Sequence, residues 1–114
     1  RDDLAARLQA VYEMAGAEVT FGVPYSGWTP NPDSPIVVLM QQVYADLYDK
    51  PATLTALHAG LETSVIGATY PNMDMISIGP NLHDVHTPNE RLEVASVAKI
   101  YDLVVATLAQ IPAQ

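Results

Sequence analysis

The polar side chains between residues 83 and 92 are the groups of this chain best suited to chemistry. Two imidazoles, two carboxylates and a guanidinium occur within ten residues of a chain that is only 16% charged. The stretch reads His83-Asp84-Val85-His86-Thr87-Pro88-Asn89-Glu90-Arg91-Leu92. Imidazole is a good zinc ligand, and catalytic zinc sites combine histidine with carboxylates from distant parts of a chain. The spacing of His83 and His86 lets both or only one reach a metal ion, although such loop histidines are more often solvated or bonded to nearby backbone.

The elements around this stretch place it at the end of a strand. The apolar run 73–78 has strand character and stops at Gly79-Pro80, and a long helical pattern follows the polar stretch. In open α/β sheets, ligands and catalytic groups gather at the carboxyl ends of the strands. A plainer interpretation of Glu90 and Arg91 is that they are first-turn charges of the next helix, or an exposed ion pair worth about 0–1 kcal/mol.

A second candidate group follows the short strand predicted at 52–57. His58 leaves the end of that strand and could face the same edge of the sheet, although an isolated histidine is more often structural. Gly60 suits a turn or the close approach of backbone to a ligand, and Glu62 could simply complement a helix dipole. The chain has no phosphate-binding loop, no His-Glu-x-x-His and no Gly-x-Ser-x-Gly.

Composition excludes several classes of function. The 114 residues suffice for one small domain with one core. A net charge of −8 would repel the phosphate backbone, so we expect no binding to nucleic acid. No apolar run approaches the roughly 20 residues needed to cross a bilayer, so we expect no membrane partner. The absence of cysteine removes disulfides, thiolate metal sites and cysteine nucleophiles.

Periodicity predicts an α/β fold in which a mainly parallel sheet is flanked by helices. Helices are expected at residues 1–15, 36–47, 61–67 and 94–109, and strands at 17–23, 52–57 and 73–78. The apolar stripe of the last helix is expected to be Val97, Ile100, Tyr101, Val104 and Leu108, covering one face of the sheet. Ser34 and Pro35 start the second helix as N-cap and first helical residue. Four prolines between residues 24 and 35 predict a hinge.

Five separated stretches resemble one family, in order and at plausible spacing. They are Tyr25-Ser26-Gly27-Trp28, Asn31-Pro32-Asp33-Ser34-Pro35, His58-Ala59-Gly60-Leu61-Glu62, Tyr70 to Pro80, and His86-Thr87-Pro88-Asn89-Glu90-Arg91-Leu92. They are similar to the C-terminal part of the aminoacyl-histidine dipeptidases, also called Xaa-His or cytosol non-specific dipeptidases. These are zinc metallopeptidases related to the aminoacylases and to glutamate carboxypeptidase. No single stretch would suffice, but the five together are specific.

The resemblance implies a catalytic α/β domain that binds two zinc ions and is interrupted by a smaller α+β lid domain. Residues 1–24 would be the last helix and strand of the lid, 25–35 the hinge, and 36–114 the C-terminal part of the catalytic domain. The implied reaction is hydrolysis of dipeptides, including Xaa-His, by a metal-bridged water with a glutamate as general base. The implied location is the cytoplasm.

The same resemblance assigns roles to single residues. His86 matches the histidine of the family's His-Ser/Thr-Pro-Asx-Glu motif and is implied to be a metal ligand, whereas His83 has no matching role. Glu90 would support that loop from the second shell of the metal, and His58, Gly60 and Glu62 would line the substrate side. The general base and the other ligands would come from an N-terminal segment that this chain lacks, so no catalytic residue is assigned here. The remainder of the catalytic domain is therefore an implied partner, and the 114 residues alone are expected to be inactive.

A different class of function also fits the residues. The chain could be a stand-alone, non-catalytic, acidic α/β interaction module on the same scaffold. The apolar faces of its terminal helices would then pair with another chain or with a copy of itself. A homodimer is compatible with either hypothesis and would not separate them, because a fragment would also expose those faces.

Overall fold

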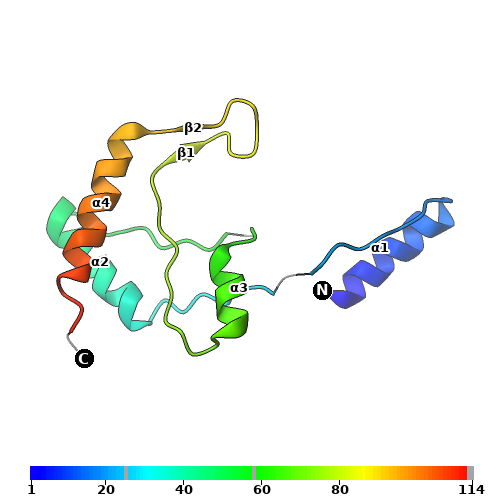
Figure 1. Cartoon of the computed structure of the whole chain (residues 1–114), viewed down its shortest axis with the longest axis horizontal. Coiled ribbons are helices and arrows are strands. Elements are labelled where there is room, and N and C mark those ends of the chain that lie inside the picture. Colours follow the sequence, from blue (N-terminus) through cyan, green and yellow to red (C-terminus); the bar gives the residue numbers. More distant parts are fainter. Residues whose placement is uncertain (25, 58, 113–114) are drawn as a thin grey trace.

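The computed structural model describes residues 1–24, 26–57 and 59–112. The sequence-based predictions for Tyr25 and His58 lie outside these ranges. Within them the chain forms four helices and one short sheet (Figure 1), in the order α1 (Asp2–Met14), α2 (Pro35–Tyr48), α3 (Glu62–Thr69), β1 (Leu82–His83), β2 (Arg91–Leu92) and α4 (Val94–Leu108). All four predicted helices are confirmed to within two residues at either end. None of the described helices is long and apolar enough to cross a membrane.

Local signals explain where the helices begin and end. Ser34 is extended (φ −68°, ψ 146°), and its hydroxyl accepts a hydrogen bond from the backbone N–H of Val37, with Pro35 in the first turn. Helix α2 ends at Asp49, which adopts the left-handed conformation that helix ends favour (φ 52°). Gly16 follows α1 with φ 83°, a conformation that glycine adopts without steric cost.

The small core lies where α2 packs against α4. Met40, Val43 and Leu103 are buried together, with Ile76 of the 73–78 segment packed against them. The phenol of Tyr48 donates a 2.7 Å hydrogen bond to the backbone carbonyl of Lys99 and so ties the two helices together. This helix pair carries the hairpin that leads into α4.

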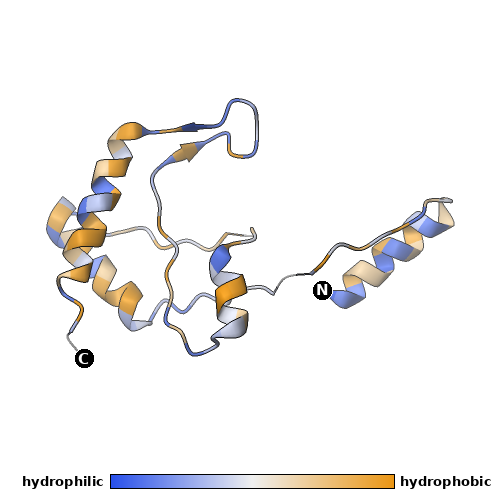
Figure 2. Cartoon of the chain, viewed as in Figure 1, coloured by the Kyte–Doolittle hydropathy of each residue, from blue (hydrophilic) through white to orange (hydrophobic). Residues whose placement is uncertain are grey.

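The predicted buried face of α4 is partly wrong. Leu103 is 4% exposed, whereas Tyr101 and Leu108 of the predicted stripe are 69% and 62% exposed. The buried positions of α4 are Ser96, Leu103 and Thr107. Because α4 carries apolar residues on more than one side (Figure 2), periodicity could not tell which side meets α2. The side of α4 that carries Tyr101 and Leu108 is exposed to solvent in this chain.

The predicted mainly parallel sheet is not confirmed. The sheet formed by the described residues has two antiparallel strands, with Leu82 opposite Leu92 and His83 opposite Arg91. The segments 17–23, 52–57 and 73–78 are extended but are not part of a β-sheet (Figure 1). A strand needs a neighbour for its backbone hydrogen bonds, and these segments have no ladder partner within the described ranges.

Helix α1 lies apart from the other elements (Figure 1). It has no buried residue, and neither α2, α3, α4 nor the hairpin contacts it. The radius of gyration is 19.0 Å, whereas a compact domain of this length should have about 13 Å. The accessible surface is 9310 Å², about 1.5 times the area expected of a folded monomer of this mass.

Candidate functional site

A β-hairpin carries the polar stretch that the sequence singled out. Its strands β1 and β2 are joined by residues 84–90, and its base is fastened to the start of α4. The backbone N–H of Glu93 donates to the carbonyl of Asn81 (3.0 Å), and the N–H of Asn81 donates to the hydroxyl of Ser96 (2.8 Å). Ser96 is buried. The core therefore positions the hairpin through the first turn of α4.

Thr87 organises the inside of the loop. Its hydroxyl donates to the carbonyl of Asp84 (2.7 Å) and accepts a bond from the backbone N–H of Asn89 (3.2 Å). Its carbonyl accepts a bond from the N–H of Glu90 (3.1 Å). Threonine side chains that bond to nearby backbone in this way stabilise tight turns. The Thr-Pro-Asn-Glu sequence is therefore a turn with its own internal bonds.

Two residues of the loop, Asp84 and His86, adopt the left-handed backbone conformation (φ 52° and 64°). This conformation costs a non-glycine residue roughly 1–2 kcal/mol, although Asp and His tolerate it better than most. The backbone N–H of His86 donates to the Glu90 carboxylate at 2.8 Å. The guanidinium of Arg91 contacts the Asp84 carboxylate at 2.7 Å. Each strained residue is thus held by one charged side chain.

The structure places the predicted ligand His86 in an exposed position on this loop. The Glu90 carboxylate accepts its hydrogen bond from the backbone N–H of His86 rather than from the imidazole. His83 lies in β1, where its Nε2 is 3.9 Å from a carboxylate oxygen of Glu93. The two histidines therefore have different neighbours. Of the described residues, no three His, Asp or Glu side chains group closely enough to hold a metal ion.

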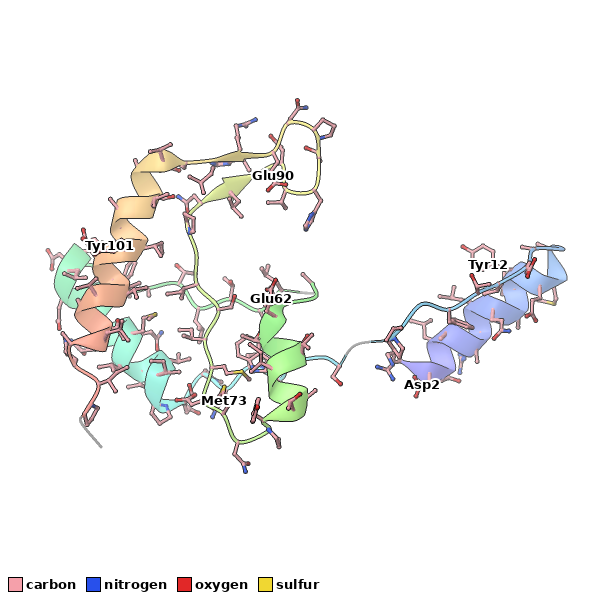
Figure 3. The ribbon with its side chains drawn as sticks, viewed as in Figure 1. Asp2, Tyr12, Glu62, Met73, Glu90 and Tyr101 are labelled. Atoms are coloured by element: carbon pink, nitrogen blue, oxygen red, sulfur yellow. The ribbon has the colours of Figure 1, made fainter. Side chains whose placement is uncertain are left out.

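Of the predicted substrate-side residues, Glu62 lies at the start of α3 rather than on the hairpin (Figure 3). Gly60 and Glu62 line an open recess of about 300 Å³ together with Leu61, Ser64 and Val65. No contact joins α3 to β1 or β2 in the described part of the chain. His86 does not line the recess that Gly60 and Glu62 share, and His58 lies outside the described residues.

Sequence reasoning missed most of the residues that build the loop. It recognised Arg91 as a possible ion-pair partner but not that its partner is Asp84, across a hairpin. It assigned no role to Thr87, Asn81 or Ser96. A usable signal was present, because a threonine followed by Pro-Asn predicts a side-chain-bonded turn, and a turn between two short runs predicts a hairpin.

Comparison with known proteins gives the family of the chain. Residues 5–110 match the family described as Peptidase family M20/M25/M40. The chain is 34% identical over its whole length to the cytosol non-specific dipeptidase of Escherichia coli (strain K12), and spans 24% of that protein. It also superimposes on the crystal structure of aminoacylhistidine dipeptidase from Vibrio alginolyticus, with a TM-score of 0.73 and 36% identity over 99% of this chain and 23% of that one. The chain thus spans about a quarter of the length of each of these relatives.

Proposed function

Because this chain belongs to peptidase family M20/M25/M40, we propose that it forms the C-terminal part of the catalytic domain of a zinc-dependent dipeptidase. The proposed enzyme is a cytoplasmic hydrolase that cleaves dipeptides, including Xaa-His. Residues 1–24 would end an inserted lid domain, 25–35 would form the hinge, and 36–114 would complete the catalytic domain. The two relatives support this proposal, because their names describe a cytosol non-specific dipeptidase and an aminoacylhistidine dipeptidase.

The preformed loop around His86 is the observation that carries the proposal. A metal ligand works best when its backbone is fixed before the ion arrives, because little ordering is then left for the binding step. The hydrogen bond that the backbone N–H of His86 donates to the Glu90 carboxylate supplies such fixing, and His86 remains exposed. The residues present fit one ligand of a metal site that other parts of the enzyme complete. They do not fit a complete site.

The proposed chemistry divides between the metal and the protein. When bound, zinc supplies Lewis acidity that polarises the peptide carbonyl and activates water. The neutral imidazole of His86 would donate a lone pair to the metal, and Glu90 would hold the backbone of His86 in place by accepting the hydrogen bond from its N–H. His58, Gly60 and Glu62 are proposed to line the substrate side, and the general base would come from outside this chain.

The large exposed surface supports the remainder of a catalytic domain as the partner. The chain is far more extended than a domain of its length, and apolar residues remain open on α2, α3 and α4 (Figure 2). Exposed apolar patches of this extent mark surfaces that another part of a protein covers. The stand-alone acidic interaction module, or a homodimer of it, is the second candidate. It is disfavoured because such a module should bury its own core, and only four apolar residues of the described ranges are buried.

Replacing His86 in a full-length dipeptidase that contains this chain tests the proposal. We expect His86→Ala to abolish dipeptide turnover and to lower the zinc content measured by elemental mass spectrometry. His83→Ala is the matched control, because it removes the same side chain from the same hairpin, and we expect it to keep both. Wild-type turnover and zinc content in His86→Ala would refute the ligand assignment. The isolated 114-residue chain should show no turnover.

A further inference from the structure

The two ends of the loop that carries His86 are joined by one contact between side chains. Asp84 follows β1, and Arg91 begins β2 directly opposite His83. The Nη1 of Arg91 lies 2.7 Å from Oδ2 of Asp84, within the range of a charge-assisted hydrogen bond. This contact therefore spans the seven residues of the loop at the point where the strands end.

The hairpin needs such a contact, because its ladder is very short. Each strand has two residues, and two-stranded hairpins are marginal in water even when they are longer. Asp84 is also held with φ 52°, and its carbonyl anchors the Thr87 hydroxyl on which the turn depends. If Asp84 moved, the turn would lose its anchor and His86 would lose its fixed position.

From these contacts we infer that Asp84 and Arg91 are a positioning pair, which holds the loop in the one conformation that presents His86. The inference deepens the proposed function and rests on it for the part that concerns metal. Neither residue needs to touch substrate or metal. Their effect acts through the backbone of the loop, as the effect of Glu90 does.

The expected size of the effect follows from exposure. Both side chains are open to solvent, and an exposed ion pair shifts an equilibrium by no more than about fivefold, less at high salt. Changing a side chain that orients a metal ligand usually costs about 10–100-fold in metal affinity. The pair should therefore matter less than Glu90 and should respond to salt.

The test uses the full-length enzyme, stripped of metal, and two measurements. The first is the dissociation constant of Zn²⁺ by competition with a chromophoric chelator. The second is hydrogen–deuterium exchange of residues 82–92. We expect Arg91→Met to weaken Zn²⁺ binding about three- to fivefold at low salt, to speed exchange in the hairpin, and to leave turnover at saturating Zn²⁺ unchanged. Arg91→Lys should keep most of the wild-type behaviour, because it retains the charge.

A variant of the other residue of the pair and a control variant complete the test. Asp84→Gly accepts the left-handed backbone but removes the carboxylate, so it should behave like Arg91→Met. Arg7→Met is the matched control, because Arg7 also forms an exposed ion pair, with Asp3 in α1, away from the hairpin. It should change neither measurement.

Several outcomes would overturn the inference. Wild-type exchange in both Arg91→Met and Asp84→Gly would show that the pair does not hold the loop. Faster exchange without any change in Zn²⁺ affinity would show that the loop conformation does not present a ligand. Loss of turnover at saturating Zn²⁺ with normal exchange would make Arg91 a substrate contact. Failure of the proposed function is separate, because it would appear as unchanged Zn²⁺ affinity in His86→Ala.

Discussion

Asp74 is expected to stabilise the start of α2, although it lies 38 residues further along the chain. Its Oδ2 accepts a 2.8 Å hydrogen bond from the backbone N–H of Ile36. The first helical residue, Pro35, has no N–H, so the N–H of Ile36 is the first helix donor without a partner in the helix. Ser34 caps the same end, but its hydroxyl is 3.4 Å from the N–H of Val37. That distance is near the limit for a hydrogen bond.

These distances set the expected magnitudes. Loss of an N-terminal capping bond costs about 0.5–2 kcal/mol, and loss of a negative charge at a helix N-terminus costs about 0.3–1 kcal/mol. Because the contact is exposed, we expect Asp74→Ala to destabilise the first turn by about 1–2 kcal/mol. Asp74→Asn keeps an acceptor and should lose about 0.3–1 kcal/mol. Ser34→Ala should lose about 0.5 kcal/mol, because its bond is long.

Hydrogen–deuterium exchange of residues 35–40 in the full-length protein reads this local stability. Asp74→Ala should speed exchange of the first-turn amides about 5- to 30-fold, the factor that corresponds to about 1–2 kcal/mol. Asp46→Ala is the matched control, because Asp46 lies in the same helix but accepts a bond from the side chain of Gln42. The reasoning is refuted if Ser34→Ala has the larger effect, or if Asp74→Ala exchanges like the control.

Two other predictions concern packing and pH. A Cβ added to Gly67 would lie 2.8 Å from the terminal carbon of Met75. Gly67→Ala should leave the free energy of unfolding in urea nearly unchanged. The flexible end of Met75 can shift to relieve this contact, and alanine favours the helix over glycine by about 1 kcal/mol. Gly67→Leu should destabilise clearly, and equal stability of the two variants would contradict close packing there. Partial desolvation first, then the charge of Asp102 and the neighbouring Tyr44, raise the pKa of Tyr48. A group whose pKa is higher in the folded than in the unfolded state contributes its full stabilisation at pH values below its unfolded pKa, which is about 10 for tyrosine. This stabilisation is lost as the pH rises through the folded pKa. As pH rises above about 10, Tyr48→Phe should therefore lose less stability than the wild type. Identical pH profiles of thermal unfolding would argue against a raised pKa of Tyr48 in the folded state.

The helices were predictable because their signals are local. Ser34-Pro35 started α2 where expected, and Gly16 followed the end of α1. The sheet was not predictable from the same pattern, since strand assignment depends on a neighbouring strand. The 52–57 and 73–78 segments have strand composition but no ladder among the described residues. The hairpin escaped detection because two-residue strands are too short to show alternation.

Sequence by itself determined the residue types of the candidate site and the family to which its motifs point. The motif around His86 could be recognised because its residues are contiguous. Tertiary structure decided what the carboxylates do: Glu90 holds a backbone N–H, Asp84 pairs with Arg91, and Asp74 caps a helix 38 residues away. A carboxylate can accept a bond from any donor within reach, so its partner depends on how the chain folds back rather than on its neighbours in sequence.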